Sequence, residues 1–165
     1  MSAVIVEATA KRLVYRPWKR GSALILLCFG VAILAGLLIW AQLNGQRLTP
    51  LIAPLLFGGA VAVYGLFYLW KNGEALIFDA AAGQIARKLP LMPASVVCRF
   101  SDIYALTTVS EMNTFEYVLT RKSERGGGDI PVSDSFYTRS QKADRQAFET
   151  HILPVIESML GLKAR

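Results

Sequence analysis

Two long apolar runs dominate the pattern of hydrophobic and polar positions along the chain. Gly21–Leu43 and Leu51–Trp70 contain no charged residue and lack the polar stripe that a soluble helix carries. A helix of about 20 apolar residues can cross roughly 30 Å of hydrocarbon. The pattern therefore predicts a transmembrane helical hairpin over residues 21–70, with Asn44–Pro50 as its connector.

A cleavable signal peptide is the alternative interpretation of the first run. The apolar region of a signal peptide has about 7–15 residues. The run here is longer, no clear small-x-small cleavage site follows it, and a second apolar run comes almost at once. These differences favour the membrane hairpin.

Beyond Trp70 the periodicity changes. In Thr114–Lys122 it is that of a half-buried antiparallel strand, with Phe115, Tyr117 and Leu119 on one face and Glu116 and Thr120 on the other. Gly83 suits a hairpin turn, and Pro131, which lacks a backbone N–H, indicates an edge strand. The predicted strands are Glu74–Asp79, Gln84–Leu89, Ser95–Phe100, Ile103–Val109, Thr114–Lys122 and Asp129–Ser133.

From Thr138 onward the spacing becomes helical. Apolar residues recur at intervals of three and four, which predicts an amphipathic helix. Pro154 kinks or divides that helix because it removes a backbone donor, and Gly161 can end it. The residues of the predicted apolar face are Phe148, Ile152, Val155, Ile156 and Met159.

The first 20 residues hold two short β-favouring pieces, Val4–Val6 and Leu13–Tyr15. They either add a strand to the C-terminal domain or form a disordered lead-in. The sequence thus divides into a basic segment (1–20), a hairpin (21–70) and a small domain (71–165). The expected fold class is a membrane α+β protein: a helical hairpin, then a small antiparallel β domain capped by a C-terminal helix.

The formal charge of +6 is unevenly distributed. Residues 1–20 hold five basic residues against Glu7 alone, a net of +4, whereas a nucleic-acid-binding protein concentrates basic charge on its folded domain. Basic residues beside a membrane helix stay in the cytoplasm. We therefore expect a multi-pass protein of the bacterial inner membrane, with both termini cytoplasmic and no nucleic-acid partner.

The sequence offers no set of catalytic, metal-ligating or cofactor-binding residues. Cys28 and Cys98 lie in different predicted elements, and a metal site needs clustered ligands that these and His151 do not supply. His151 has no Asp, Ser or Cys at a recognisable spacing, so a structural or surface role is favoured. We predict neither an enzyme nor a bound cofactor.

Residues near the ends of the two runs are typical of membrane–water interfaces. The predicted interface anchors are Trp18, Lys19, Arg20, Trp40, Trp70 and Lys71. Small residues let membrane helices approach closely, either each other or a partner's helix. The predicted helix-packing positions are Gly30, Gly36, Gly58, Gly59 and Gly65.

Two groups of cations are candidate contacts for phosphates or lipid headgroups. Arg121, Lys122 and Arg125 belong to the glycine-rich stretch RKSERGGG, which has no nucleotide-binding framework and equally suits a solvated hairpin tip. Arg87 and Lys88 follow the hairpin more closely in sequence. They can contact anionic headgroups or be ordinary outward-facing strand residues.

Antiparallel strands closed by a C-terminal amphipathic helix resemble a pleckstrin-homology-like (PH-like) domain. The matching features are the hairpin, the turn LIFDAAAGQI, the segment FEYVLTRKSERGGGDIPVSDSF and the helix QAFETHILPVIESML. The order is similar to that of small bacterial two-helix membrane proteins with a PH-like cytoplasmic domain. In layout only, it is also similar to the photosystem I assembly protein. The family's domains resemble a seven-stranded pair of sheets, more strands than Glu74–Ser133 provides, and Val4–Tyr15 would have to supply the rest.

The resemblance implies a membrane-tethered binding or scaffolding module without enzymatic activity. Our first hypothesis is an accessory or assembly protein of a membrane complex, whose cytoplasmic domain binds a protein partner. A module that senses anionic membrane lipids is the second. The third is an inactive subunit of a membrane enzyme or transporter.

Overall fold

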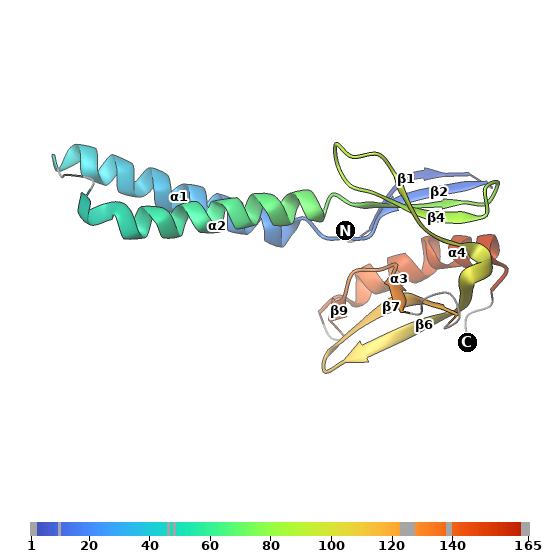
Figure 1. The fold of residues 1–165 in the computed structure, drawn as a ribbon. Helices are drawn as coiled ribbons and strands as arrows, with labels where there is room; N and C mark the ends of the chain where they lie inside the picture. Colours follow the sequence, from blue (N-terminus) through green and yellow to red (C-terminus); the bar gives the residue numbers. More distant parts are fainter. Residues whose placement is uncertain are drawn as a thin grey trace. The chain divides into compact units, whose positions relative to one another are not determined.

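The computed structural model describes residues 3–9, 11–45, 47, 49–122, 128–137 and 140–162. The chain forms two units, a helical unit (Arg20–Gly73) and a β unit (Met1–Lys19 with Glu74–Arg165). The helical unit therefore interrupts the β unit in sequence, and each unit can be followed by its colours in Figure 1.

The helical unit consists of two long antiparallel helices with a short 3-10 turn before the second. Its elements are α1 (Gly21–Leu43), η1 (Thr49–Leu51) and α2 (Ile52–Lys71). The predicted apolar helices are confirmed to within a residue at each end. Gly21–Leu43 and Thr49–Lys71, of 23 residues each, are long and apolar enough to cross a membrane. Large apolar side chains cover their outer faces.

Three glycines of the helical unit allow α1 and α2 to pack closely. A Cβ atom at Gly30 would lie 2.7 Å from Ala62 Cα, and one at Gly65 would lie 2.8 Å from Leu27 Cα. Gly58 meets Ile33 in the same way, at 2.8 Å from its Cγ2. By contrast, no atom lies within 4 Å of a Cβ built at Gly36 or Gly59. Only the first three glycines are therefore required by the packing of the hairpin itself.

Sheet A of the β unit is a five-stranded antiparallel meander in the order β1-β2-β3-β4-β5. Its second and third strands flank the helical unit in sequence, yet they pair directly, with Tyr15 opposite Leu76. The basic segment, residues 1–20, thus supplies one edge strand and one interior strand of sheet A. The strands are β1 (Val4–Ala8), β2 (Arg12–Arg16), β3 (Ala75–Asp79), β4 (Gln84–Lys88) and β5 (Ser95–Arg99).

Sheet B has four strands around a central β7 (Thr114–Arg121). The short 3-10 helix η2 (Phe100–Asp102) leads into it from sheet A, and β6 (Ile103–Glu111) pairs with one side of β7. The other side of β7 pairs with β8 (Asp129–Pro131) and with the two-residue strand β9 (Phe136–Tyr137). Pro131 lies on a strand that pairs with β7 alone, as its missing N–H predicts.

Two helices, α3 (Lys142–His151) and α4 (Leu153–Leu160), follow sheet B. The predicted C-terminal helix is thus divided at Ile152 into two helices, which is one of the two outcomes expected from Pro154. Pro154 occupies the first turn of α4, where its missing N–H is tolerated. Gly161 ends α4 at a φ of 65°. Thr138, where the helical pattern begins, lies outside the described residues.

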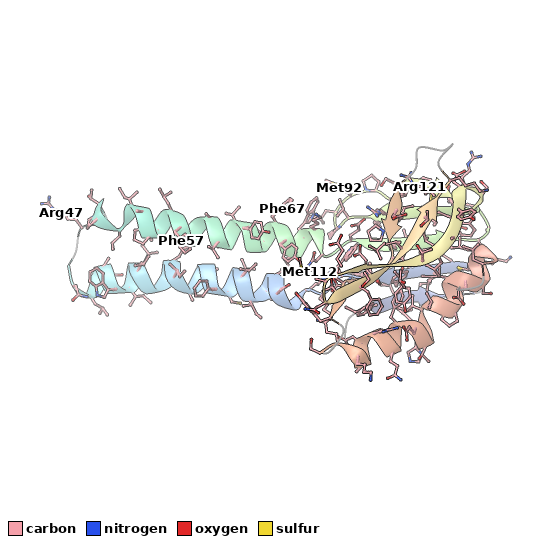
Figure 2. The ribbon with its side chains drawn as sticks, turned by 90° about the horizontal axis from the view of Figure 1, so that it is seen from below. Arg47, Phe57, Phe67, Met92, Met112 and Arg121 are labelled. Atoms are coloured by element: carbon pink, nitrogen blue, oxygen red, sulfur yellow. The ribbon has the colours of Figure 1, made fainter. Side chains whose placement is uncertain are left out.

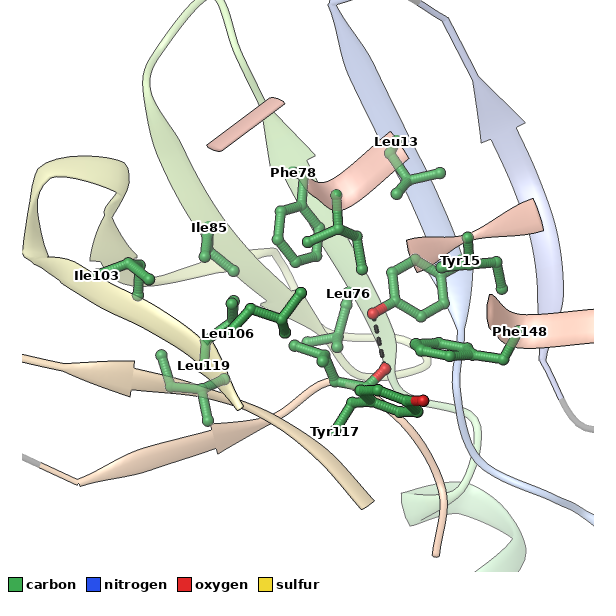
Figure 3. Packing of buried hydrophobic residues seen from close by; sticks show 14 of the residues in the cluster. Leu13, Tyr15, Leu76, Phe78, Ile85, Ile103, Leu106, Tyr117, Leu119 and Phe148 are labelled. Carbon is green, nitrogen blue, oxygen red and sulfur yellow. Dashed lines mark hydrogen bonds between the residues drawn. The ribbon is translucent and has the colours of Figure 1, made fainter. Parts of the chain in front are cut away.

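The core of the β unit is shared by the two sheets and the two helices (Figures 1 and 3). The Phe148 ring of α3 packs on Tyr15 of sheet A and stacks on Tyr117 of sheet B, with ring centroids 6.5 and 5.3 Å away. The Tyr15 hydroxyl donates a hydrogen bond of 2.7 Å to the Val132 carbonyl. Tyr15 is 0% exposed, so this bond joins the sheets in the interior.

The two ends of the β unit are chemically different. At one end, here called the hairpin end, the chain leaves β2 for α1 and returns from α2 to β3. The opposite end carries the β3–β4 turn, where Gly83 has a φ of 61°, and is here called the turn end. The amide of Phe100 donates to the Gly83 carbonyl there, which places η2 at the turn end as well.

Candidate functional site

An apolar groove runs between the edge strand β1 and the helix α3. It has a volume of about 370 Å³ and is lined mainly by aliphatic and aromatic side chains. Phe148 of α3 and Ile152, which follows α3, belong to the core and form the floor of the groove, because both are almost fully buried. The complete lining is Ala3, Val4, Ile5, Asp144, Ala147, Phe148, His151 and Ile152.

The wall of the groove on the β1 side is an open sheet edge. Among the described strands β1 pairs only with β2, and its side chains Val4, Ile5 and Val6 are 53%, 42% and 55% exposed. The pairing with β2 shifts between Ile5 and Glu7, so that Val6 forms a bulge. Bulges at an edge hinder strand-to-strand aggregation. The apolar half of β1 thus faces the groove without offering a long regular edge.

The groove begins at the hairpin end of the β unit. Val4 pairs with Arg16, the last residue of β2, so the groove begins at the hairpin end. Asp144 lies at the same end, since it forms an ion pair of 3.1 Å with Lys19. Lys19 also donates its backbone amide to Asp134 at 3.2 Å. A molecule bound in the groove would therefore lie beside Lys19, the last residue of the β unit before the helical unit.

The polar residues of the groove do not form a recognisable catalytic set. Asp144 is engaged by Lys19, and His151 is exposed on the last turn of α3. No group of three or more His, Cys, Asp or Glu residues that could hold a metal ion occurs among the described residues. The arrangement can bind an apolar segment, but it offers no pair of groups for acid–base chemistry.

A cluster of charged and aromatic residues joins α3 to sheet B. The Glu149 carboxylate accepts hydrogen bonds from the Tyr117 hydroxyl and from Arg145 Nε, the latter at 2.6 Å. The Arg145 guanidinium lies 4.2 Å from the centre of the Phe115 ring, a cation–π contact. Through burial and the Glu149 carboxylate, the pKa of Tyr117 rises to about 12.

The pKa of Glu149 moves the other way. Burial alone would raise it, but the hydrogen bonds from Tyr117 and Arg145 outweigh burial and lower it. At neutral pH the cluster therefore holds a protonated tyrosine and an ionised carboxylate. Tyr117 is only 7% exposed, so the cluster acts as a structural link rather than as a reactive site.

The cations predicted as phosphate contacts lie at opposite ends of the β unit. Arg121 and Lys122 lie at the turn end, where the Lys122 amide donates to the Asp102 carbonyl of η2. Arg87 and Lys88 lie at the hairpin end, because they pair with the first residues of β3. Arg125 lies outside the described residues. The described cations therefore do not converge on one phosphate site.

Several of these cations already bind groups of the protein itself. The Arg121 Nε donates to the Gly128 carbonyl at 3.3 Å, and the Lys122 Nζ donates to the Ser101 carbonyl at 2.7 Å. Arg87 forms an ion pair of 3.3 Å with Glu74, which is almost fully buried. Lys88 is exposed. Each of the first three thus has a structural role.

The predicted interface anchors divide between the two units. Arg20, Trp40, Trp70 and Lys71 belong to the helical unit, with Trp40 50% exposed and Trp70 packed near Phe67. In the β unit, Trp18 is half-buried and Lys19 is fixed by its ion pair with Asp144. Lys19 therefore has a partner within the β unit, which sequence reasoning did not anticipate.

Sequence reasoning also missed the groove, because its two walls lie far apart in the chain. One local signal was available, the run Val4–Val6, in which three consecutive apolar residues all prove exposed. A strand buried on one face should alternate instead. In comparisons with known proteins, the chain matches no family model and no curated sequence.

Proposed function

We propose that the chain is a non-enzymatic, membrane-anchored accessory protein whose β unit binds a protein partner of a membrane complex. Its hairpin crosses the bacterial inner membrane, and the β unit, a PH-like module, stays in the cytoplasm. The observation that carries the proposal is the apolar groove between β1 and α3, which opens at the hairpin end.

The pairing of β2 with β3 supports a hairpin of two spans. These strands lie on either side of the helical unit in sequence and are hydrogen-bonded neighbours. A single membrane crossing would separate them, so a chain with this sheet needs both ends of its hairpin on one side. The excess positive charge of residues 1–20, together with Lys71, favours the cytoplasmic side.

The shape and lining of the groove support a protein partner. An amphipathic helix or an extended apolar segment can fill a groove of this kind, with its apolar side chains on Phe148 and Ile152. A groove at the end of the β unit to which the hairpin is joined suits the cytoplasmic segment of a membrane protein. The PH-like likeness supports a binding module, although the β unit has a five-stranded and a four-stranded sheet rather than seven strands in all.

Paired variants of α3 test this function. Ala147 lines the groove, whereas its exposed neighbour Gln146 does not. Ala147→Arg and Gln146→Arg add the same side chain to the same helix. We expect tagged full-length protein, purified in a mild detergent, to retain its co-purifying membrane protein in the Gln146→Arg variant and to lose it in the Ala147→Arg variant.

Two outcomes of this experiment would contradict the proposal. A wild-type protein that purifies alone would argue against an accessory role altogether. A partner that both variants retain would leave the accessory role intact but would place the binding surface elsewhere. Circular dichroism of both variants controls for folding, because an Arg at either exposed position should leave the helix intact.

A lipid-sensing module is less well supported. The described cations that would read anionic headgroups lie at two ends of the β unit, and three of them bind protein groups. Such a set offers a vesicle no single basic face. We therefore favour a protein partner over anionic lipid as the ligand of the β unit.

A further inference from the structure

Two loops of the β unit expose an apolar residue in an unfavourable backbone conformation. Leu91, between β4 and β5, has a φ of 65° and is 102% exposed. Met112, between β6 and β7, has a φ of 50° and is 104% exposed. In the described part of the chain they are the non-glycine residues with positive φ. At a positive φ a residue with a Cβ atom is disfavoured, and glycine or asparagine would adopt this backbone conformation more easily.

Both tips lie at the hairpin end. The β4–β5 loop follows Lys88, which pairs with Ala75, the first residue of β3 after the helical unit. Met112 precedes β7, and the opposite end of β7 leads to Lys122 and the turn end. Figure 2 shows Met92 and Met112 at the same end of the β unit and Arg121 away from them.

The neighbours of each tip extend its apolar surface. Met92, beside Leu91, is 48% exposed, and prolines flank the pair on both sides. Tyr137 of β9 is 55% exposed and, with Met112, borders a shallow hollow of about 580 Å³. Aromatic rings of this kind favour the boundary between headgroups and acyl chains.

We propose that these two tips, Leu91–Met92 and Met112 with Tyr137, contact the lipid surface of the leaflet from which the hairpin emerges. The proposal rests on the membrane anchoring of the hairpin proposed above. A bilayer is the occupant we choose because the two tips come from different sheets, expose Leu91 and Met112 completely and lie at the same end of the β unit, so that one extended apolar surface can contact both. Both also project from the end where the chain enters its apolar helices.

The charges near the tips set the depth of the contact. Lys88 is exposed beside the first tip and suits anionic headgroups, whereas Glu111 is exposed beside Met112. A carboxylate resists transfer into hydrocarbon. The tips therefore reach the headgroup and upper acyl region, and the β unit is held against the membrane at positions other than the hairpin itself.

Fluorescence quenching in the full-length protein tests the contact. Single cysteines at Leu91→Cys, Met112→Cys and Ala81→Cys, in a Cys28→Ser and Cys98→Ala background, would carry an environment-sensitive dye. The native Cys28 in a Cys98→Ala chain reports on the hairpin. The chains are placed in nanodiscs of phosphatidylethanolamine and phosphatidylglycerol. These contain lipids with a spin label near the headgroup or, for Cys28, in the middle of the acyl chain, because residue 28 lies about 10 Å beyond the start of α1.

We expect strong quenching and a blue-shifted emission at positions 91 and 112, and neither at position 81 in the turn end. Quenching at Cys28 with no more quenching at 91 and 112 than at 81 would overturn the lipid contact and leave the anchored hairpin standing. Absence of quenching at Cys28 would overturn the anchoring and the lipid contact with it.

Glycine substitution separates lipid contact from a structural role. Leu91→Gly and Met112→Gly relieve the unfavourable φ, so we expect the β unit of the full chain in detergent to melt at an equal or higher temperature. A dye at Ala94→Cys, in the same loop as Leu91, should lose its quenching in the Leu91→Gly chain. A lower melting temperature would show that the tip is needed for folding and would contradict the inference.

Discussion

The interior position of β2 in sheet A predicts that residues 74–165 do not fold without the residues that precede the hairpin. We propose to compare two shortened chains. One is residues 74–165 alone. The other joins residues 1–19 to residue 74 through a flexible linker that replaces the helical unit. Tyr15 and Leu76 are opposed in the pairing of β2 with β3, at the spacing of about 5 Å usual for such pairs. A linker of about six residues, which reaches about 20 Å when extended, joins the short segments that continue from these two strands.

The expected loss of stability follows from the buried side chains of β2. Leu13 and Tyr15 are both 0% exposed, and burying a side chain of this size contributes about 1.5–3 kcal/mol. The hydrogen bond from Tyr15 to the Val132 carbonyl adds about 1 kcal/mol. Together these terms give roughly 4–7 kcal/mol, against about 5–15 kcal/mol for a whole small domain. Residues 74–165 alone should therefore be largely unfolded.

Urea denaturation followed by circular dichroism measures the difference. We expect a cooperative transition for the joined chain and none for residues 74–165. Trp18 is the single tryptophan of the joined chain and gives a second probe of the same transition. Leu13→Ala should cost about 2–5 kcal/mol in the joined chain, and the exposed Arg12→Ala less than about 0.5 kcal/mol. A cooperative transition of residues 74–165 at the same midpoint as the joined chain would refute this reasoning.

Three further predictions follow from individual contacts. Tyr15→Phe should destabilise the joined chain by about 1–3 kcal/mol in urea, because the buried Val132 carbonyl loses its donor. The pKa of Tyr117 is raised to about 12, so the stability it contributes is complete below pH 10 and is lost as the pH rises from 10 to 12. Urea midpoints across this range should fall more steeply in the wild type than in Tyr117→Phe. In the full chain, Gly65→Leu should reduce cross-linking between α1 and α2, and Gly59→Leu should not, because only Gly65 faces the other helix closely.

The sequence predicted best what depends on local pattern alone. The uncharged apolar run Gly21–Leu43 became α1 with the same bounds, because a continuous apolar segment has few alternatives. Gly83 and Gly161 adopt the positive φ expected of a turn and a helix end. The six strands predicted after the hairpin, which became β3 to β8, fall within about two residues of their predicted bounds.

What the sequence left open depends on contacts between distant residues. The pieces Val4–Val6 and Leu13–Tyr15 are short, and their role is decided by β3, which lies beyond the whole helical unit. The two-residue strand β9 is too short for any periodicity, and it exists because β7 offers Thr114 and Phe115 as partners.

The candidate site was less predictable than the fold for the same reason. The groove combines Ile5 with Ala147, which no local pattern can bring together. Lys19 looked like an anchor for phosphates because it lies next to an apolar run. Its partner Asp144 is far along the chain, so only the folded β unit reveals the ion pair.

The insertion of the helical unit between two paired strands connects membrane topology to folding. β2 is made before the hairpin and β3 after it, yet β2 needs β3 as its neighbour to bury Leu13 and Tyr15. Under the proposed topology, sheet A can close only after both helices have crossed the membrane and returned the chain to its starting side. A failed second crossing would leave β2 and β3 on opposite sides. The β unit would then lack an interior strand of sheet A, and the groove between β1 and α3 would not form. The proposed binding surface therefore requires correct insertion of both helices.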